Sequence, residues 1–581
     1  MQNQLENMIK NVKTDTFDNI VKIIDHYIND DKIPVKQKYN FGLYLSHLGK
    51  TQELSYFLKK VNKPLANYIN NDSTLLLIAC KHKLEANSIS LIELMEPETI
   101  NYSTKQNINA LLLACLYKSE IIALKLIEKM SDEAIFKITV IGECILHIAC
   151  SNNMSNVVLR ILERLGQLNQ SSVHRNIVNI KYRNNNTLLH IACLNKMEDV
   201  AIKLLDFVSD ENINNISRIG ETVLHVACQN SLVNVAKLLL NRVTDKIINT
   251  VSLSHKTILS ACCYNKLSEI ALQLIDRMNP STINQLNMTN ESALFIACYM
   301  NLPVVAYKLS HLSYKKTLCT YNFTNGSPLI GACRNKMTEV ALILMEKMSM
   351  DAIRHFDCYG ESAFTIACKY GLTILASKLI DKVTSNDLNR IIYNSETVLH
   401  YACNSKMNDI ALKILDKLPP NNIIVNTSNI HFRTALAICC ENGSTDVAIK
   451  LISMMTPQMI NFIDNRGYSA FSTACCFNYE TIAFELVKKT NIETINHTGP
   501  TIISPLTYVL NNNMESVKSY LMDNDEYIQS LENIISNPYK YNNKTIKIVK
   551  EFKELAEGTI MMVQMRNSIK TNNNKRKFNE L

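Results

Sequence analysis

The chain has 581 residues, 18 cysteines and a formal net charge of +8. Hydrophobic residues make up 47% and charged residues 20%, which is typical of a protein with a buried core. The small, dispersed charge disfavours a nucleic-acid partner, because a nucleic-acid surface needs a dense basic stripe. No apolar stretch approaches the roughly 18 residues that span a bilayer, and the first residues lack the apolar segment of a signal peptide. We therefore expect an intracellular, cytoplasmic protein without membrane contact.

An amphipathic helix is the first predicted element. Phe17, Ile20, Val21, Ile24 and Tyr27 fall at helical spacing and form one apolar stripe. We assign residues 1–34 to an N-terminal helical segment that docks on the domain after it.

A short apolar segment that ends in an alanine–cysteine pair then recurs, mostly at steps of 35 residues. Self-similarity at a period of about 20–50 residues indicates a solenoid, in which each unit packs only on its neighbours. We expect about fourteen repeats over residues 35–523, with degenerate caps centred on Leu45 and Val509. The other copies of the slot hold Ala79, Ala114, Ala149, Ala192, Ala227, Ala261, Ala297, Ala332, Ala367, Ala402, Cys439 and Ala474.

Most cysteines directly follow this slot. Equivalent residues of stacked helices lie about 8–10 Å apart, whereas a disulfide needs Cα atoms within about 7 Å. This geometry therefore disfavours a ladder of disulfides, and we expect the thiols to pack as small apolar groups in a reducing compartment. The adjacent pairs Cys262–Cys263, Cys439–Cys440 and Cys475–Cys476 lack the spacing of zinc or redox sites, so we expect them to pack in the core as well.

Two short helices are predicted in each repeat. In residues 187–206 the first helix carries an apolar face with Leu188 and Leu189, and the second carries one with Val200 and Leu204. A polar turn separates them, and a polar connector that often contains Ile-Asn follows. Neither helix is long enough to be stable alone in water, so stacking on neighbouring repeats must stabilise both.

This unit resembles the ankyrin repeat, which has a β-turn, two helices, a period of about 33 residues and a Thr-Pro-Leu-His-x-Ala signature. The signature is carried by Thr187-Leu-Leu-His190, Thr222-Val-Leu-His225, Thr397-Val-Leu-His400 and, with its proline, Ser327-Pro-Leu329. The resemblance implies an all-α, ankyrin-type α-solenoid of helix-turn-helix repeats with short β-turn connectors. In the turn between helices, Lys196-Met197 and its equivalents replace the family's Gly-His with one extra residue, which predicts a wider turn.

The Asn-, Ile- and Lys-rich sequence is similar to the ankyrin-repeat proteins of large DNA viruses.

The recurring histidines His147, His190, His225 and His400 occupy the signature position of the repeat. The resemblance implies that they brace successive turns. No acidic or cysteine ligand recurs around them at zinc spacing, so we expect no metal site. Phosphate-binding, nucleophile-elbow and zinc-protease motifs do not occur in a suitable context. We therefore expect no enzyme activity, catalytic residue, cofactor or small-molecule substrate.

One step of 43 residues, between Ala149 and Ala192, carries an insertion near residues 166–172, which we interpret as a surface loop. Residues 524–581 form a C-terminal helical segment, with an amphipathic helix over 545–556 and a polar, basic tail. Lys575, Arg576 and Lys577 in that tail could serve as a nuclear address, although a solvated chain end is the alternative interpretation.

The resemblance implies a monomeric scaffold that binds a partner protein through its concave side. In the family, partner contacts lie on the turn tips and on the exposed face of the first helices. The residues at those places that we expect to contact the partner are Arg183, Arg218, His255, Asn290, Tyr359 and Arg466.

The alternative is an adaptor that recruits a substrate to a ubiquitin-ligase complex, as in ankyrin proteins of some large DNA viruses. Residues 524–581 show no Leu-Pro-initiated helical box of the kind such adaptors carry. If ligase components co-purify with the full chain but not with a chain that ends at residue 523, the passive scaffold is excluded.

Overall fold

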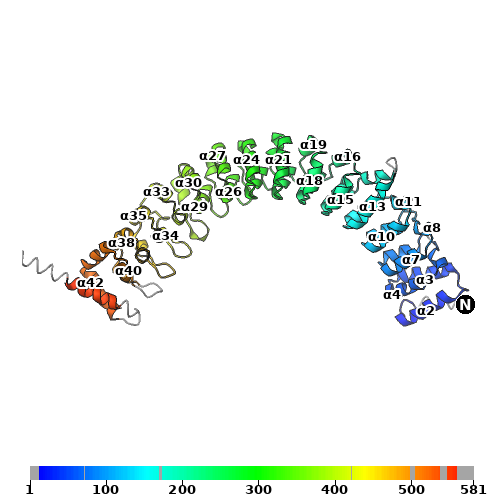
Figure 1. Cartoon of the computed structure of the whole chain (residues 1–581), viewed down its shortest axis with the longest axis horizontal. Helices are drawn as coiled ribbons and strands as arrows, with labels where there is room; N and C mark the ends of the chain where they lie inside the picture. Colours follow the sequence, from blue (N-terminus) through cyan, green and yellow to red (C-terminus); the bar gives the residue numbers. More distant parts are fainter. Residues whose placement is uncertain are drawn as a thin grey trace, which may run out of the picture. The chain divides into compact units, whose positions relative to one another are not determined.

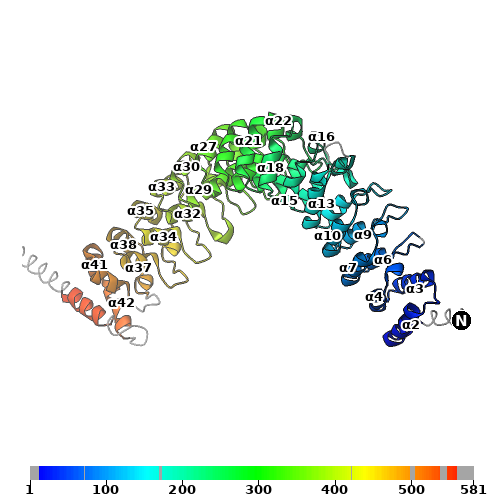
Figure 2. The same cartoon turned by 45° about the vertical axis from the view of Figure 1, so that its right-hand side comes forward.

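The structure is a computed structural model, and it describes residues 12–70, 72–168, 173–420, 422–497, 504–536 and 546–558. Over these ranges the regular structure is helical, and β pairing is confined to isolated bridges within turns. The chain divides into two compact units, Met1–Met288 and Thr289–Leu581. Figures 1 and 2 show that the helix pairs of each unit follow one another side by side.

First helices begin directly after a Thr, Ser or Asn side chain in most repeats. That side chain accepts a hydrogen bond from the backbone of the first turn, as Thr187 does from the N–H of His190. In the first unit these helices are α3 (Val35–His47), α6 (Leu75–Lys81), α9 (Ala110–Leu116), α12 (Ile145–Ser151), α14 (Leu188–Leu194), α17 (Val223–Gln229) and α20 (Ile258–Tyr264). In the second unit they are α23 (Ala293–Tyr299), α26 (Pro328–Arg334), α29 (Ala363–Lys369), α32 (Val398–Asn404), α34 (Ala435–Asn442), α37 (Ala470–Cys476) and α40 (Pro505–Asn511).

Second helices pack antiparallel on the first. In the first unit they are α4 (Thr51–Lys59), α7 (Glu85–Leu94), α10 (Glu120–Lys129), α13 (Ser155–Gln167), α15 (Glu198–Leu204), α18 (Val233–Leu240) and α21 (Ser268–Arg277). In the second unit they are α24 (Pro303–Leu312), α27 (Thr338–Lys347), α30 (Thr373–Leu379), α33 (Asn408–Asp416), α35 (Thr445–Met454), α38 (Glu480–Val487) and α41 (Glu515–Met522).

Most connectors contain one or two short helical segments that the sequence did not predict. These turns are α5 (Lys63–Ala66), α8 (Pro97–Ile100), α11 (Asp132–Ile135), α16 (Asp210–Ile213), α19 (Asp245–Ile248), α22 (Pro280–Ile283), α25 (Lys315–Leu318), α28 (Met350–Ile353), α31 (Ser385–Leu388), α36 (Pro457–Ile460), α39 (Ile492–Ile495) and the 3-10 segments η1 (Val173–Asn179), η2 (Arg183–Asn185) and η3 (Tyr393–Ser395). Many end on the Ile-Asn pair recognised in the sequence.

One backbone bond fixes the register of the repeats. The carbonyl of the slot residue accepts the N–H of the residue five positions later, as between Ala227 and Leu232 at 2.9 Å. In the described residues this bond occurs at Leu45, Ala79, Ala114, Ala149, Ala192, Ala227 and Cys262 of the first unit, and at Ala297, Ala332, Ala367, Ala402, Cys439, Ala474 and Val509 of the second. The bond therefore confirms about fourteen repeats, with Leu45 and Val509 in the end positions.

The register also corrects one assignment. The predicted slot at Ala261 is wrong, because the N–H of Leu267 bonds to the carbonyl of Cys262 and Thr257 caps the helix. Cys262 and Cys263 thus fill the alanine–cysteine slot, and the steps on both sides of this repeat become 35 residues. Among the adjacent cysteine pairs, Cys476 is exposed rather than packed in the core, which corrects that expectation.

Asparagines at the ends of first helices tie each repeat to the one before it. The side-chain amide donates to the backbone carbonyl of the preceding repeat's cysteine, as from Asn195 to Cys150 and from Asn335 to Cys298, both at 2.7 Å. The same bond is made by Asn152, Asn230, Asn265, Asn442 and Asn512. Most of these carbonyls also accept a backbone N–H of their own repeat, as Cys150 does from Asn153 at 3.0 Å. The asparagine amide therefore fills the second acceptor site of the carbonyl and joins the two repeats.

Cationic side chains at the ends of second helices make the corresponding link on the other row of helices. Nη1 of Arg242 donates to the carbonyl of Leu205 at 2.7 Å, and Nη2 donates to that of Val208 at 3.0 Å. Lys417 makes the same contacts through Nζ, at 2.7 Å to Ile380 and 3.0 Å to Val383. A cation beside the negative end of a helix is stabilising, so this link combines a hydrogen bond with the helix dipole.

The sequence analysis predicted a wider turn between the two helices of a repeat, and this prediction is wrong. Lys196 occupies the position that Gly443 holds in its own repeat, and both take a left-handed backbone, with φ of 57° and 72°. The flanking Met197 and Ser444 also share one conformation. Lysine therefore adopts the glycine geometry in a turn of the same length.

The ends of the solenoid are covered by further helices. At the N-terminus α2 (Phe17–Asn29) buries Ile20, Ile24 and Tyr27, and Tyr27 stacks on Phe41 with ring centroids 4.7 Å apart. At the C-terminus α42 (Asp525–Ile535) packs on α41, and a further helix spans 546–558. The basic tail with Lys575, Arg576 and Lys577 lies outside the described residues, as does most of the predicted insertion loop.

No helix in the described part of the chain is long and apolar enough to cross a membrane.

Replacing a linking asparagine tests this account of the stack. Asn335→Ala removes the side-chain donor that bonds the carbonyl of Cys298 in the preceding repeat, so we expect the free energy of unfolding to fall by about 1 kcal/mol, the net contribution of a typical intramolecular hydrogen bond. Asn404→Ala is the control, because Asn404 is exposed near the end of the next but one first helix. Urea unfolding followed by circular dichroism measures both. Equal effects of the two substitutions would contradict the account.

Candidate protein-binding surface

The turn between repeats forms a tight five-residue tip. In residues 217–221 the N–H of Ser217 donates to the carbonyl of Glu221 at 2.8 Å, and Gly220 takes φ of 80°. The same closing bond defines tips at 104–108, 139–143, 182–186, 217–221 and 252–256 of the first unit and at 322–326, 357–361, 392–396, 429–433 and 464–468 of the second. We call these residues the turn-tip row.

Side chains at the start of a tip hold its backbone. Oδ1 of Asp357 accepts the N–H of Tyr359 at 2.9 Å and that of Glu361 at 3.0 Å. Asp464 holds Arg466 and Tyr468 in the same way, each at 2.9 Å. Such local bonds are the reason that Asp and Asn favour turns.

Backbone bonds also join one tip to the next. The N–H of Arg218 donates to the carbonyl of Asn184 at 2.8 Å, and that of Leu253 donates to Ile219 at 2.9 Å. In the second unit Cys358 donates to Thr324 at 3.0 Å. The tips of neighbouring repeats are therefore rigidly spaced, which lets side chains on different repeats act as one surface.

Three of the predicted contact residues lie on consecutive tips of the first unit. Arg183, Arg218 and His255 are all exposed. Arg183 forms an ion pair with Glu143 at 2.7 Å, and His255 takes a left-handed backbone with φ of 57°. The structure thus brings these three residues onto neighbouring positions of one surface.

The other three lie in repeats of the second unit that are not consecutive. Asn290 is exposed, and its side chain donates to the carbonyl of Tyr321 at 2.6 Å. Tyr359 is exposed at the tip of its own repeat. Arg466 forms ion pairs with Glu441 at 2.6 Å and with Asp464 at 3.0 Å. Each residue projects from a tip or supports one, but the three do not form a single cluster.

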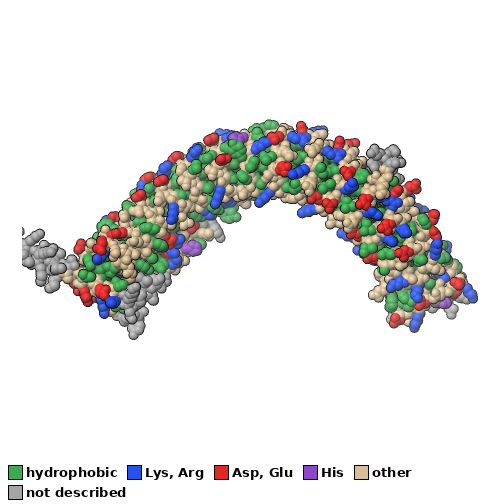
Figure 3. All heavy atoms as spheres, viewed as in Figure 1, with side chains coloured by type: hydrophobic (Ala, Val, Ile, Leu, Met, Phe, Trp, Pro, Cys, Tyr) green, Lys and Arg blue, Asp and Glu red, His purple; other side chains and the backbone are tan. Residues whose placement is uncertain are grey.

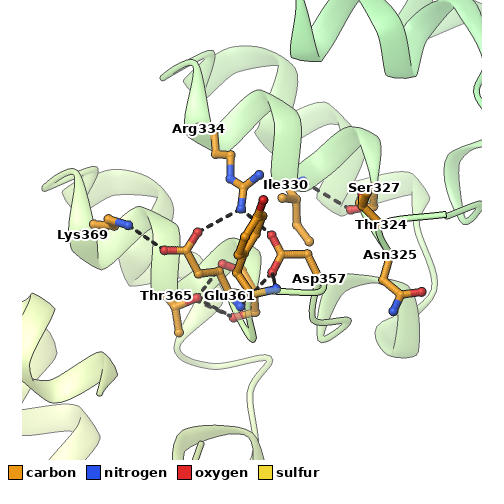
Figure 4. A network of polar contacts seen from close by, with 12 residues as sticks. Thr324, Asn325, Ser327, Ile330, Arg334, Asp357, Glu361, Thr365 and Lys369 are labelled. Atoms are coloured by element: carbon orange, nitrogen blue, oxygen red, sulfur yellow. Dashed lines mark hydrogen bonds and ion pairs between the residues drawn. The ribbon is translucent and has the colours of Figure 1, made fainter. Parts of the chain in front are cut away.

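A charged network links tips to first-helix ends in the second unit (Figure 4). Arg334 pairs with Asp357 and, at 2.9 Å, with Glu361, while Lys369 donates to Glu361 at 2.7 Å. Burial alone would raise the pKa of Glu361, but the bonds from Lys369 and Arg334 outweigh it and the pKa is lowered. The carboxylate therefore stays charged and holds the tip against the ends of α26 and α29.

Apolar side chains on the tips are the feature that the sequence analysis missed. The exposed fraction is 72% for Leu253 and 73% for Ile141 in the first unit, and 80% for Phe323 in the second. Further exposed apolar tip residues that it missed are Val140, Ile219, Ile430 and Phe432. Turn residues are usually polar, so apolar residues at tip positions were a signal available once the repeats had been aligned.

The signature histidines are buried structural groups. Nδ1 of His190 accepts the N–H of Thr187 at 3.3 Å, and Nε2 lies 3.3 Å from the carbonyl of Glu221 in the next tip. Burial lowers the pKa of His190 and of His400 from 6.5 to about 4, so both are neutral near pH 7. In the described residues no group of three or more His, Cys, Asp or Glu side chains is placed to hold a metal ion.

The slot thiols are equally inert. Burial raises the pKa of Cys80 and of Cys263 to about 12, and all the cysteines of the described residues are free. A thiol with such a pKa remains protonated and is a poor nucleophile.

A comparison with protein-family models supports the resemblance inferred from the sequence. Residues 146–250 and 399–498 match the model for ankyrin repeats (3 copies). A search of curated proteins finds no match. The chain therefore contains ankyrin repeats, and its fold is an all-α solenoid of the ankyrin type. Ankyrin repeats are in general modules that bind other proteins.

The buried histidines predict a specific pH dependence. The unfolded chain binds a proton at each of His147, His190, His225 and His400 near pH 6.5, whereas the folded chain binds it only near pH 4. Their contribution to stability is therefore fully present above about pH 6.5 and is lost as the pH falls toward about 4. Thermal unfolding midpoints across this range measure the effect.

The control is His190→Asn, which removes one of these titrating groups. We expect its unfolding midpoint to depend less steeply on pH between about 4 and 6.5 than that of the unmodified chain. An unchanged slope would show that His190 does not titrate between the folded and unfolded states.

Proposed function

We propose that this protein is a scaffold that binds a partner protein through the face formed by the turn-tip row and the adjacent ends of the first helices. We propose this face, within each unit, as the concave side named in the sequence analysis. The observation that supports the proposal best is the exposure of apolar side chains on tips that backbone bonds hold in fixed register. Rigid apolar groups are suited to binding, because little side-chain or loop entropy is lost on association.

Basic and acidic side chains are interspersed on the face that Figure 3 displays, which favours a protein partner over a polyanion. Arg183, Arg218, His255, Asn290, Tyr359 and Arg466 remain the proposed contact residues. The protein is proposed to act as a monomer, and its role as a ubiquitin-ligase adaptor stays a prediction from the sequence.

Site-specific photo-crosslinking in cells that express the full chain tests the proposal. A photoreactive phenylalanine analogue replaces His255, a position whose equivalent in another repeat is Phe432 and which therefore accepts an aromatic side chain. The control places it at Lys246, an exposed residue of α19. We expect the His255 position to form a covalent product with a partner protein and the Lys246 position to form little. Products at Lys246 alone would contradict the proposal.

A further inference from the structure

Cations that form no ion pair with a described residue lie in and beside the tips of the first unit. Arg218 and Lys256 lie within tips, and Lys137 and Lys181 lie just before two others. All four side chains are exposed, and none forms an ion pair with a described residue. They are therefore available to an external anion.

The acidic side chains of the same tips are already engaged. Glu143 is 16% exposed, pairs with Arg183 at 2.7 Å and accepts the hydroxyl of Tyr182 at 2.9 Å. Glu221 accepts the amide of Gln229 at 2.8 Å. The charge of Glu143 is thus compensated by Arg183, whereas Glu221 keeps its charge beside the neutral Gln229 amide. Because Arg218, Lys256, Lys137 and Lys181 outnumber it, the uncompensated charge around these tips is mainly positive.

Apolar groups alternate with these cations. Ile141, Ile219 and Leu253 are 73%, 54% and 72% exposed on the tips. Leu116 and Leu194, at 49% and 47%, extend the apolar surface onto the ends of the first helices. The bond between Gln229 and Glu221 shows that first-helix ends adjoin the tips, so both sets belong to one face.

We infer that this face of the first unit binds an extended segment of another protein in which acidic and apolar side chains are interleaved. The inference rests on the proposed function and specifies the chemistry of its partner. Apolar contacts exclude water around the ion pairs, and ion pairs shielded from water are stronger than exposed ones.

Spacing favours an extended chain as the occupant. Neighbouring repeats lie about 10 Å apart, as packed helices do. An extended chain advances about 3.3 Å per residue, so it passes one tip roughly every three residues. A segment of about twelve residues therefore reaches four consecutive tips, with one acidic and one apolar side chain for each.

A nucleic acid is the less suitable occupant. Phosphate groups would pair with the cations. The sugar-phosphate backbone, however, offers no apolar surface to contact the exposed Ile219 and Leu253 side chains. The experiment below therefore includes a nucleic acid as an alternative ligand.

Fluorescence anisotropy with the full chain tests the inference. The probes are a labelled twelve-residue peptide that interleaves Glu with Leu and Phe, the same peptide with Lys for Glu, a poly-Glu peptide of equal length, and a single-stranded DNA oligonucleotide. The charge variant is Arg218→Glu with Lys256→Glu, and the apolar variant is Ile219→Ser with Leu253→Ser. Lys246→Glu on α19 is the matched charge control.

We expect the Glu-containing apolar peptide to bind best and its binding to weaken with rising salt. Each double variant should weaken binding about tenfold or more, and Lys246→Glu should change it by less than about twofold. All these side chains are exposed, so circular dichroism should show an unchanged fold.

Three outcomes would overturn the inference. Equal binding of poly-Glu or DNA with no effect of the apolar variant would indicate a general polyanion surface. Preference for the Lys-containing peptide would refute the charge argument. Absence of peptide binding, while His255 still crosslinks to a partner in cells, would show that the partner presents a different surface. In that last case the scaffold proposal stands. Absence of both peptide binding and crosslinking would contradict the scaffold proposal as well as the inference about its partner.

Discussion

The close approach of consecutive first helices is the constraint on which the rest of the structure depends. Two small residues, usually alanine and cysteine, occupy the contact, and they are buried in repeat after repeat. A larger side chain there would separate the helices and break the amide bonds from asparagines such as Asn195 to the preceding cysteine carbonyl. The recurrence of cysteine therefore reflects size and burial, and the raised pKa of a slot thiol such as Cys80 is a consequence of that burial rather than a sign of chemistry.

Side chains of neighbouring repeats donate hydrogen bonds to the carbonyls at the helix ends. The tip side chains therefore contribute little to the packing of the core. Arg242 and Lys417 close the ends of second helices, and asparagines close those of first helices. Tip side chains need only leave the five-residue turn intact, and Asp357 or Gly220 suffices for that. The exposed residues of each tip can therefore differ between repeats. The apolar and basic residues of the first unit occupy these exposed positions.

Much of the fold was predictable because the residues that specify it act locally. Thr187 and His190 cap a helix within their own repeat, and small residues at a fixed spacing mark each contact. The register at Ala261 was not predictable from spacing alone, since Ala261, Cys262 and Cys263 are all small, and only the bond from Leu267 distinguishes them. The left-handed conformation of Lys196 also escaped prediction, because the length of the turn, not its residue type, imposes it.

The location of the candidate surface was predictable from the sequence, but the exposure of its apolar side chains was not. Placing Arg183, Arg218 and His255 on tips needed only the position of the turn in the repeat. Recognising Ile141 and Leu253 as exposed required the backbone of the tip, because apolar residues in a short loop can equally point into the core.

Hydrogen–deuterium exchange tests the central claim, that binding takes place on the turn-tip row, most directly. The measurement compares the full chain alone with the chain bound to the protein that crosslinks at His255. The account predicts slower exchange in peptides that contain tips 139–143, 217–221 and 252–256, with no change in α13 and α18. Protection confined to α13 and α18, with tips that exchange as in the free chain, would contradict it.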